Sequence, residues 1–394
     1  MTVQENVGVL VTFAEESAFG TPPSGSGTSY RLRRTTSSLT LQKDTFQSNE
    51  VRPDQQVSSF RHGGHRVAGA IEGELSTESY DILLAALMRQ DDWTAGVALD
   101  ESDFTSLAVS SGVITLASGN PSTLGLRIGD IVDFTNMSEA ANNTRARIIA
   151  MTATTFTTYP ALADQSADSE CDVAVVGEKL IFGTEKRSFT FEHSYPGIDV
   201  ARRFDGCRIG GASFRVPPND KVMVSFDVMG QKGVVLDAGS APYFTNATAA
   251  PNTEVLTGIE GGLRMAGAEQ AIVTGFDLQV SHNLTTAPVV GSPYVPDIFY
   301  GRIVVTGNVS FYLADKELIE AFINEEEHDL VLVCEDATGD EFISFNMQRV
   351  KFGGASDAPT GDGGVIVTAP FQALLKSAGV GYDATTLTIQ RSNA

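Results

Sequence analysis

The chain has 394 residues, enough for two or three domains, and 42% of them are apolar, so it can bury a sizeable core. Its formal net charge is −22, from 49 acidic and 27 basic side chains. A surface of this sign is not expected to hold nucleic acid, because proteins that grip DNA present basic groups to its phosphates. The charge suits plain solubility, and also a protein that works near DNA without adhering to it.

No segment predicts export or a membrane span. The opening MTVQENVGVLVTF lacks the basic stretch and cleavage site of a secretory signal, and no apolar run reaches the roughly 20 residues that cross a bilayer. Cys171, Cys207 and Cys334 are odd in number and widely spaced, which predicts free thiols. We therefore expect a soluble protein that is made in the cytoplasm.

In chain order, residues 1–30 are polar and include FGTPPSGSGTS, which predicts a flexible N-terminal arm. Residues 31–93 then predict a strand, a long connection (Thr45–His65), a second strand and a short helix. Ser76 or Thr77 is suited to cap that helix. The connection is too long for a tight hairpin and too polar for a core, and loops of this length are usually functional or disordered.

Between residues 94 and 178 the pattern changes to short alternating runs broken by Gly, Asn and Ser. GVITLASG, LRIGDIVDF and RARIIAMTATTFTTYP show the period of two that is typical of strands, without a helical period. Three further strands, predicted at 187–195, 207–216 and 221–230, complete the interrupted unit. The pattern predicts a small all-β domain inserted into a first domain of residues 31–93 and 179–235.

The second half repeats the first. HRVAGAIEGELSTESYDILLAALM (His65–Met88) aligns without a gap with GRIVVTGNVSFYLADKELIEAFIN (Gly301–Asn324), at an offset of 302 − 66 = 236. SLTLQ (Ser38–Gln42) lies over GFDLQ (Gly275–Gln279) at an offset of 237, and Asp315 is placed to cap the second helix. Any two amphipathic strand–helix units look alike, but two elements in the same order at nearly one offset favour a tandem duplication.

The repeat sets the remaining boundaries. Residues 236–269 read as a connector, and residues 270–394 as a second domain that completes itself without an insertion.

No motif predicts catalysis, a cofactor or a metal. NEEEHD (Asn324–Asp329) reads as a solvated helix end rather than a cation loop. The RHGGH stretch contains His62 and His65 without further ligands. No phosphate-binding loop, G-x-S-x-G turn or H-E-x-x-H helix is present. Scattered carboxylates leave a hydrolase open but unsupported. The remaining histidines lack a partner pattern: His193, His282 and His328.

Several segments resemble the tail tube (major tail) proteins of bacteriophages with long non-contractile tails. They are EESAFGTPP (Glu15–Pro23), LTLQKDTFQSNEVRPDQQ (Leu39–Gln56), HGGHRVAGAIEGELSTESYDILLAALM (His62–Met88) and SFRVPPNDKVMVSFDVMG (Ser213–Gly230). The resemblance covers roughly residues 10–90 and 185–235, and the second half through the repeat. It implies a mainly β fold with two tandem sandwich or barrel domains, each flanked by a helix. The inserted domain departs from the family pattern.

The resemblance also implies a function. Such proteins form rings that stack into a tube in the virion tail, and DNA passes through the tube from the capsid to the host cell. With two tube domains per chain, six ring positions need three chains, a homotrimer with pseudo-six-fold symmetry; the rival is a hexamer with one half lining the bore. Tail-tip, tape-measure and tail-terminator proteins would be partners. The lumen would be acidic and would not bind DNA, no membrane anchor is involved, and the inserted domain would face outward.

Two long loops, Thr45–His65 and Asn283–Tyr300, are the expected contacts with the next ring. An alternative function is a β-rich surface- or glycan-binding module, which the single tryptophan (Trp93) does not favour because it leaves no aromatic platform. The inter-ring candidates are Phe46, Arg52, Asp54, Phe60, Val289, Tyr294 and Asp297.

Overall fold

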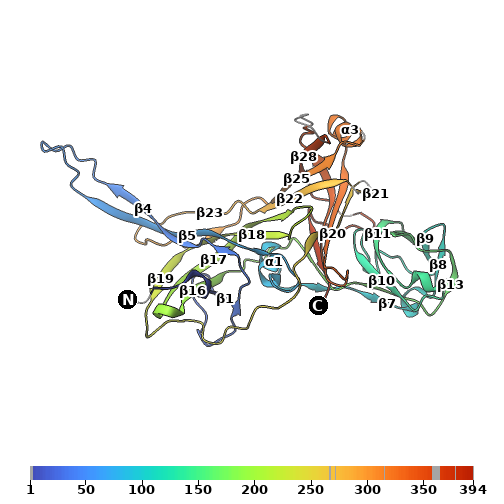
Figure 1. Cartoon of the computed structure of the whole chain (residues 1–394), viewed down its shortest axis with the longest axis horizontal. Helices are drawn as coiled ribbons and strands as arrows, with labels where there is room; N and C mark the ends of the chain where they lie inside the picture. The colour runs from blue at the N-terminus through green and yellow to red at the C-terminus, as the bar shows by residue number, and fades with distance from the viewer. Residues whose placement is uncertain are drawn as a thin grey trace.

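The computed structural model describes residues 3–265, 268–270, 272–314, 316–356, 364–377 and 379–393. The fold is mainly β, as the resemblance implied, and three short α-helices occur in the described residues. Most strands belong to one large network, eight form a separate sheet, and two short strands form a third (Figure 1).

The first half builds an antiparallel sheet in the order β4–β5–β18–β17–β16–β1. The sheet forms because apolar side chains recur at every second residue. In β18, Val224, Phe226 and Val228 point into the core while the residues between them face outward. Three short strands add to it: β2 (Tyr30–Arg31) pairs with β1, β3 (Thr36–Ser37) with β5, and β19 (Lys232–Leu236) with the first part of β17. The main elements are β1 (Leu10–Glu15), β4 (Thr40–Gln47), β5 (Phe60–Glu74), α1 (Asp81–Leu87), β16 (Phe189–Tyr195), β17 (Val200–Val216) and β18 (Met223–Gly230).

The second half has the same strand order, β22–β25–β28–β27–β26–β20, which is what the predicted duplication required. The two helices start 317 − 81 = 236 residues apart and have equal length. The elements are β20 (Thr257–Met265), β21 (Ala268–Glu269), β22 (Val273–Ser281), β25 (Val304–Tyr312), α3 (Glu317–Ile323), β26 (His328–Glu335), β27 (Phe342–Phe352), β28 (Ile366–Ala373) and β29 (Thr388–Arg391).

Residues 98–175 form the eight-stranded sheet, in the order β13-β8-β9-β12-β11-β10-β14-β7. It has its own core around Phe104, Phe134 and Phe156, and it lies beside the second half (Figure 1). The chain enters and leaves through paired strands β6 (Thr94–Ala95) and β15 (Glu178–Ile181). The other elements are β7 (Ala98–Leu99), α2 (Glu101–Phe104), β8 (Leu107–Ser110), β9 (Val113–Leu116), β10 (Ile131–Thr135), β11 (Arg145–Met151), β12 (Thr155–Tyr159), β13 (Gln165–Asp168) and β14 (Asp172–Val175).

Two expected boundaries differ from the structure. Residues 1–30 are not all a flexible arm, because β1 pairs with β16 and Phe13 is only 4% exposed. Likewise, residues 236–269 are not only a connector, because β20 pairs with β26 of the second half. Both strands find their partners far along the chain, so local composition could not reveal them.

The helix caps also differ. Helix α1 follows Tyr80, which makes no side-chain cap, whereas Ser76 bonds to Ser79 and Arg33, and Thr77 bonds to Glu341. The expected cap Asp315 lies outside the described residues.

The alignment of the first strands is shifted. Thr40 pairs with Ala68, and at an offset of 236 Ala68 corresponds to Val304, whose partner is Ser281. Thr40 therefore corresponds to Ser281 and not to Asp277, a slip of four residues. An even slip keeps the same side chains inward, so the apolar pattern alone does not exclude it.

Candidate assembly surfaces

The two halves are joined edge to edge. Residues 211–216 of β17 pair antiparallel with residues 276–281 of β22, so one sheet runs across both halves. Phe214, Phe276 and Leu278 are buried beneath this junction, and Phe214 lies 4.7 Å from Phe345 between ring centroids. The junction is therefore part of the main core and not a flexible link.

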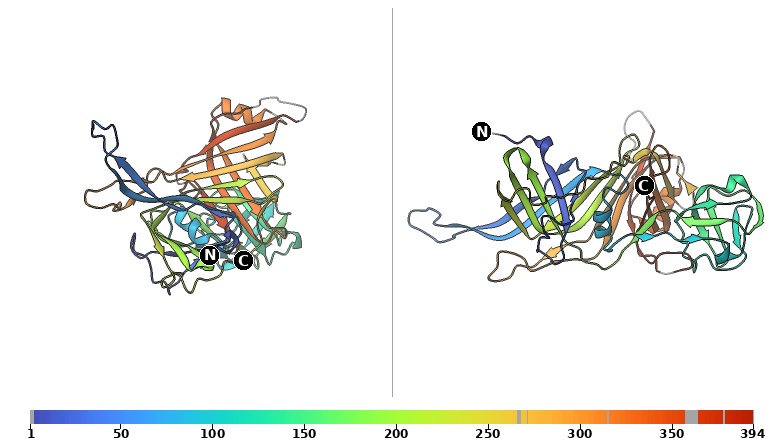
Figure 2. Two further views of the ribbon diagram at one scale, coloured as in Figure 1. Left: turned by 60° about the vertical axis from the view of Figure 1, so that its left-hand side comes forward. Right: turned by 90° about the horizontal axis from the view of Figure 1, so that it is seen from below.

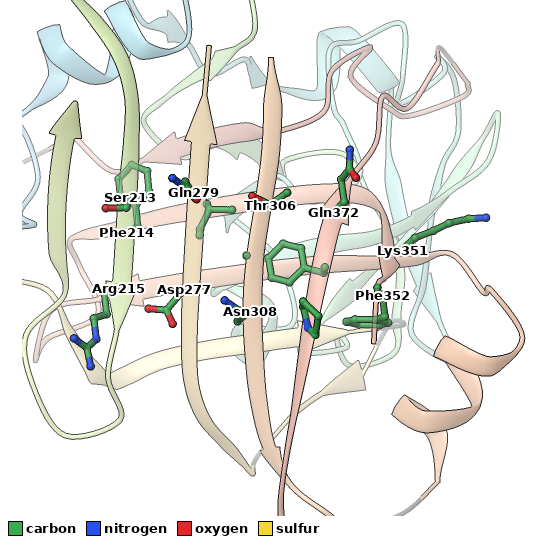
Figure 3. Close-up of a pocket in the computed structure, with 15 residues that line it drawn as sticks. Ser213, Phe214, Arg215, Asp277, Gln279, Thr306, Asn308, Lys351, Phe352 and Gln372 are labelled. Atoms are coloured by element: carbon green, nitrogen blue, oxygen red, sulfur yellow. The ribbon is translucent and has the colours of Figure 1, made fainter. Parts of the chain in front are cut away.

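The opposite face of this sheet is open and polar. Along one row, Ser213, Gln279, Thr306 and Gln372 lie opposite one another on successive strands (Figure 3). They line a shallow hollow with a volume of about 770 Å³. In the next row the charged residues Arg215 and Asp277 are cross-strand neighbours. The face thus presents amides, hydroxyls and mixed charges to solvent.

A buried arginine fastens the second half to the first. Arg208 of β17 forms an ion pair with Asp297, 2.8 Å away, and bonds to the carbonyl of Ile298. Its guanidinium also stacks over the rings of Phe19 and Tyr300, at 4.6 and 5.6 Å from the centroids. Burial raises the pKa of Tyr300, so its hydroxyl stays neutral here. Sequence reasoning missed Arg208, because its polar partners Asp297 and Ile298 lie about 90 residues further along the chain.

A histidine fastens the end of α1 in the same region. His282 Nε2 lies 2.6 Å from the carbonyl oxygen of Leu87, and burial lowers the pKa of the imidazole. A neutral ring can donate to this carbonyl, which is one of those that a helix leaves unpaired at its C-terminal end. The end of β22 thereby caps the helix of the first half.

The predicted loop Thr45–His65 is instead a long two-stranded arm. Strands β4 and β5 stay paired out to Gln47 and Phe60, so only residues 48–59 are loop. The arm projects from the body (Figure 1), which leaves both of its faces in solvent and removes the alternating pattern that marks a half-buried strand. Phe46 and Phe60 are 58% and 61% exposed.

The tip of the arm carries a charged turn. Arg52 donates two hydrogen bonds to Asp54, each 3.1 Å long, and this contact lowers the pKa of the carboxyl. Val51 and Val57 are exposed beside it. The tip thus displays apolar and charged groups without a partner surface in the described part of the chain.

The second loop, Asn283–Tyr300, projects on the same side as the arm (Figure 2). Its ends pair as β23 (Thr285–Thr286) and β24 (Ile298–Phe299), and Val289 is exposed. Tyr294 packs edge-on against His65, with centroids 5.3 Å apart. Of the seven candidates, Phe46, Arg52, Asp54, Phe60 and Val289 are exposed, whereas Tyr294 and Asp297 contact the first half of their own chain.

The eight-stranded unit is held on the second half by polar groups around a small apolar contact. The Gln390 side chain bonds to the backbone N–H and carbonyl of Ile131 and to the carbonyl of Val176, at 2.8–2.9 Å. Ile131 packs on Val331, Val333 and Phe342.

A buried cluster of charged side chains lies next to this contact between the eight-stranded unit and the second half. Lys179 lies 3.1 Å from Asp130 and 3.7 Å from Asp383, which Arg127 also contacts. Burial raises the pKa of Asp130 to about 6, and this effect outweighs the attraction of Lys179.

The described residues contain no cluster of three or more His, Cys, Asp or Glu side chains placed to hold a metal. All three cysteines are free and buried, and burial raises their pKa values, which keeps the thiols protonated and unreactive. Within the same residues, none of the helices has the length and apolar character needed to cross a membrane.

Comparison with known proteins agrees with this mainly β architecture. The family model described as phage tail tube protein matches residues 8–373. The chain belongs to this family, and is therefore a structural protein of the phage tail that assembles with itself and with other tail components. A search of curated proteins finds no match.

Proposed function

We propose that the chain is the subunit of the tail tube wall, and that three copies close into a ring with pseudo-six-fold symmetry. One observation carries this proposal: two halves with the same strand order are joined edge to edge in a single sheet. Each chain thus supplies two successive positions, and a ring with six positions needs three chains. Such a head-to-tail contact closes only if the rotation between positions is fixed, and the junction sets this rotation between the two halves of one chain.

The open polar face is proposed to line a channel that conducts DNA from the capsid to the host cell. Binding to DNA needs lysines and arginines placed along its phosphates, or aromatic rings that stack on bases. Ser213, Gln279, Thr306 and Gln372 offer neither. Lys351, which follows Gln372 in this row, lies 3.9 Å from Glu325 and Glu327, and Arg215 has Asp277 opposite. In this proposal the acidic balance keeps DNA from adhering to the surface in general, and amides and hydroxyls line the path itself.

The other surfaces take the remaining roles. The arm tip and Val289 would contact the next ring, and tail-tip, tape-measure and tail-terminator proteins would bind the tube ends and lumen. The eight-stranded unit would face outward, because a channel sized for DNA leaves no room for it. Synthesis in the host cytoplasm precedes assembly into the virion tail.

Electron microscopy of assembled tubes tests the proposal. End-on averages should show three-fold symmetry with six similar inner lobes. Six chains per ring would contradict the trimer, and a chain that stays monomeric under all conditions and binds glycans would contradict the tube function.

A further inference from the structure

The junction between the two halves of a chain has a counterpart on each outer edge of its sheet. In the second half, β27 has the position that β17 has in the first half. In the first half, β3 and the beginning of β4 have the position that β22 has in the second half. In the described residues, β3 and β4 pair only with β5, and residues 351–356 pair only with β28. Within the described residues, two strand edges of one chain therefore lack a backbone partner, and such edges recruit further strands.

The strand pairings fix how these edges would match. Strands β5 and β25 correspond residue by residue at the offset of 236. The residue pairs between neighbouring strands extend this correspondence to the outer strands, where Lys351 corresponds to Gly211 and Thr40 to Ser281. Gly211 and Ser281 lie opposite each other at the internal junction. By this template Thr40 of one copy lies opposite Lys351 of the next.

The outer edge is more polar than its internal counterpart. The inward side chains of β22 are Phe276, Leu278 and Val280, all buried, and their counterparts are Thr35, Ser37 and Leu39. Ser37 does face inward, since its hydroxyl lies 2.9 Å from His193 Nε2. A contact made through the outer edge therefore buries less apolar surface, and apolar burial is the main source of association free energy.

The outer edge also lacks a contact like the one by which Arg208 joins the two halves. By the same residue pairs the counterpart of Arg208 is Arg349. Arg349 already binds Glu327 of its own half, at 2.6 and 2.7 Å, so it is not available in the way that Arg208 is for Asp297.

We propose that residues 35–40 of one copy add to residues 351–356 of a second copy in the register Thr40–Lys351, and that this contact is weak by composition. The free chain then stays monomeric until a nucleus or a growing tube presents several contacts at once. This inference rests on the proposed tube function and names the contact that closes the ring.

Disulfide trapping tests the register. The full chain carrying Thr40→Cys and Lys351→Cys should, on oxidation at rising concentration, give covalent species that end at three chains. An equal mixture of the two single variants should give only a dimer. The control pair Thr40→Cys with Ser356→Cys should not react, because four to five residues along a strand separate its cysteines by about 15 Å. Equal trapping in both pairs overturns the register.

Sedimentation tests the weakness. The wild-type chain should be a monomer at micromolar concentration. Ser37→Val, which adds an apolar side chain on the inward side, should lower the concentration at which rings appear about tenfold. Ser38→Val, on the opposite side of the same edge, should leave it unchanged. Melting curves check that each variant folds.

Stable trimers of the wild-type chain at micromolar concentration, or equal effects of the two valines, overturn the proposed weakness. If the variant with Thr40→Cys and Lys351→Cys forms rings but its two cysteines do not cross-link on oxidation, the register is rejected and the tube function is not. A chain that forms neither rings nor tubes under any condition rejects the tube function itself.

Discussion

At the scale of single residues, buried carboxylates hold segments that lack regular structure. Glu192 of β16 is completely buried and accepts hydrogen bonds from the backbone N–H groups of Tyr243 and Phe244 and from the Thr12 hydroxyl. Buried N–H groups must be paired, because leaving them unpaired costs free energy. One buried side chain thus helps to hold a segment between the two halves in place.

Glu192→Ala should therefore lower the free energy of unfolding by about 3 kcal/mol, since it leaves two buried donors without an acceptor. Chemical denaturation measures this. The exposed Glu185→Ala is the matched control and should change stability little. Equal stability of the two variants would show that Glu192 holds nothing.

Asp130 predicts a pH dependence. The folded chain keeps its proton up to about pH 6, whereas the unfolded chain loses it near pH 3.8. The folded state thus binds more protons between these values, so the free energy of unfolding falls as pH rises from 4 to 6, by up to about 3 kcal/mol.

Asp130→Asn removes this dependence, so the difference in stability between variant and wild type should change across that window. Denaturation at pH 4 and 6.5 measures it, with the exposed Asp91→Asn as control. A wild-type profile parallel to that of Asp130→Asn would contradict the raised pKa.

At the scale of elements, the arm of β4 and β5 is an extension that the body does not need. Its outer residues contact little of the main core, and Gln47 and Phe60 face each other where the loop begins. The body is instead closed by pairings at the base, beginning near Ala68. Folding and ring stacking should therefore be separable.

Replacing residues 48–59 by Asn-Gly makes a two-residue turn that fits the paired ends of the arm. We expect an unchanged melting temperature and intact rings that no longer stack into long tubes, as seen by electron microscopy. The milder Val289→Ser tests the second loop in the same assay. Normal tubes from the arm variant would exclude the arm from contacts between rings.

At the scale of the whole molecule, the net charge of −22 and the polar open face work in the same direction. Affinity for duplex DNA depends on how many phosphates basic groups neutralise. The overall charge supplies no excess of such groups, and the two basic residues in the rows around Gln279, Arg215 and Lys351, both have acidic neighbours. In the proposed channel, passage of DNA would then need no release step.

Affinity of the soluble chain for duplex DNA should accordingly be negligible at physiological salt. Replacing Gln279 and Gln372 by Lys adds two positive charges to the open face and should produce weak binding that disappears as salt is raised. Fluorescence anisotropy measures both. Micromolar binding by the wild-type chain with a steep salt dependence would contradict a non-adhesive face.

The sequence by itself determined the β-rich fold, the duplication and the positions of both helices. The alternation of apolar and polar residues and the repeat at an offset of 236 residues can both be read from the order of residues without knowing which segments are in contact. Tertiary structure decided what depends on partners far along the chain. Four contacts join segments more than 25 residues apart: β1 with β16, Thr40 with Ala68, Arg208 with Asp297, and Ile131 with the second half. Alternation assigns a side chain to a face but not to a neighbour, so only the folded sheet could show which edges meet and which remain open.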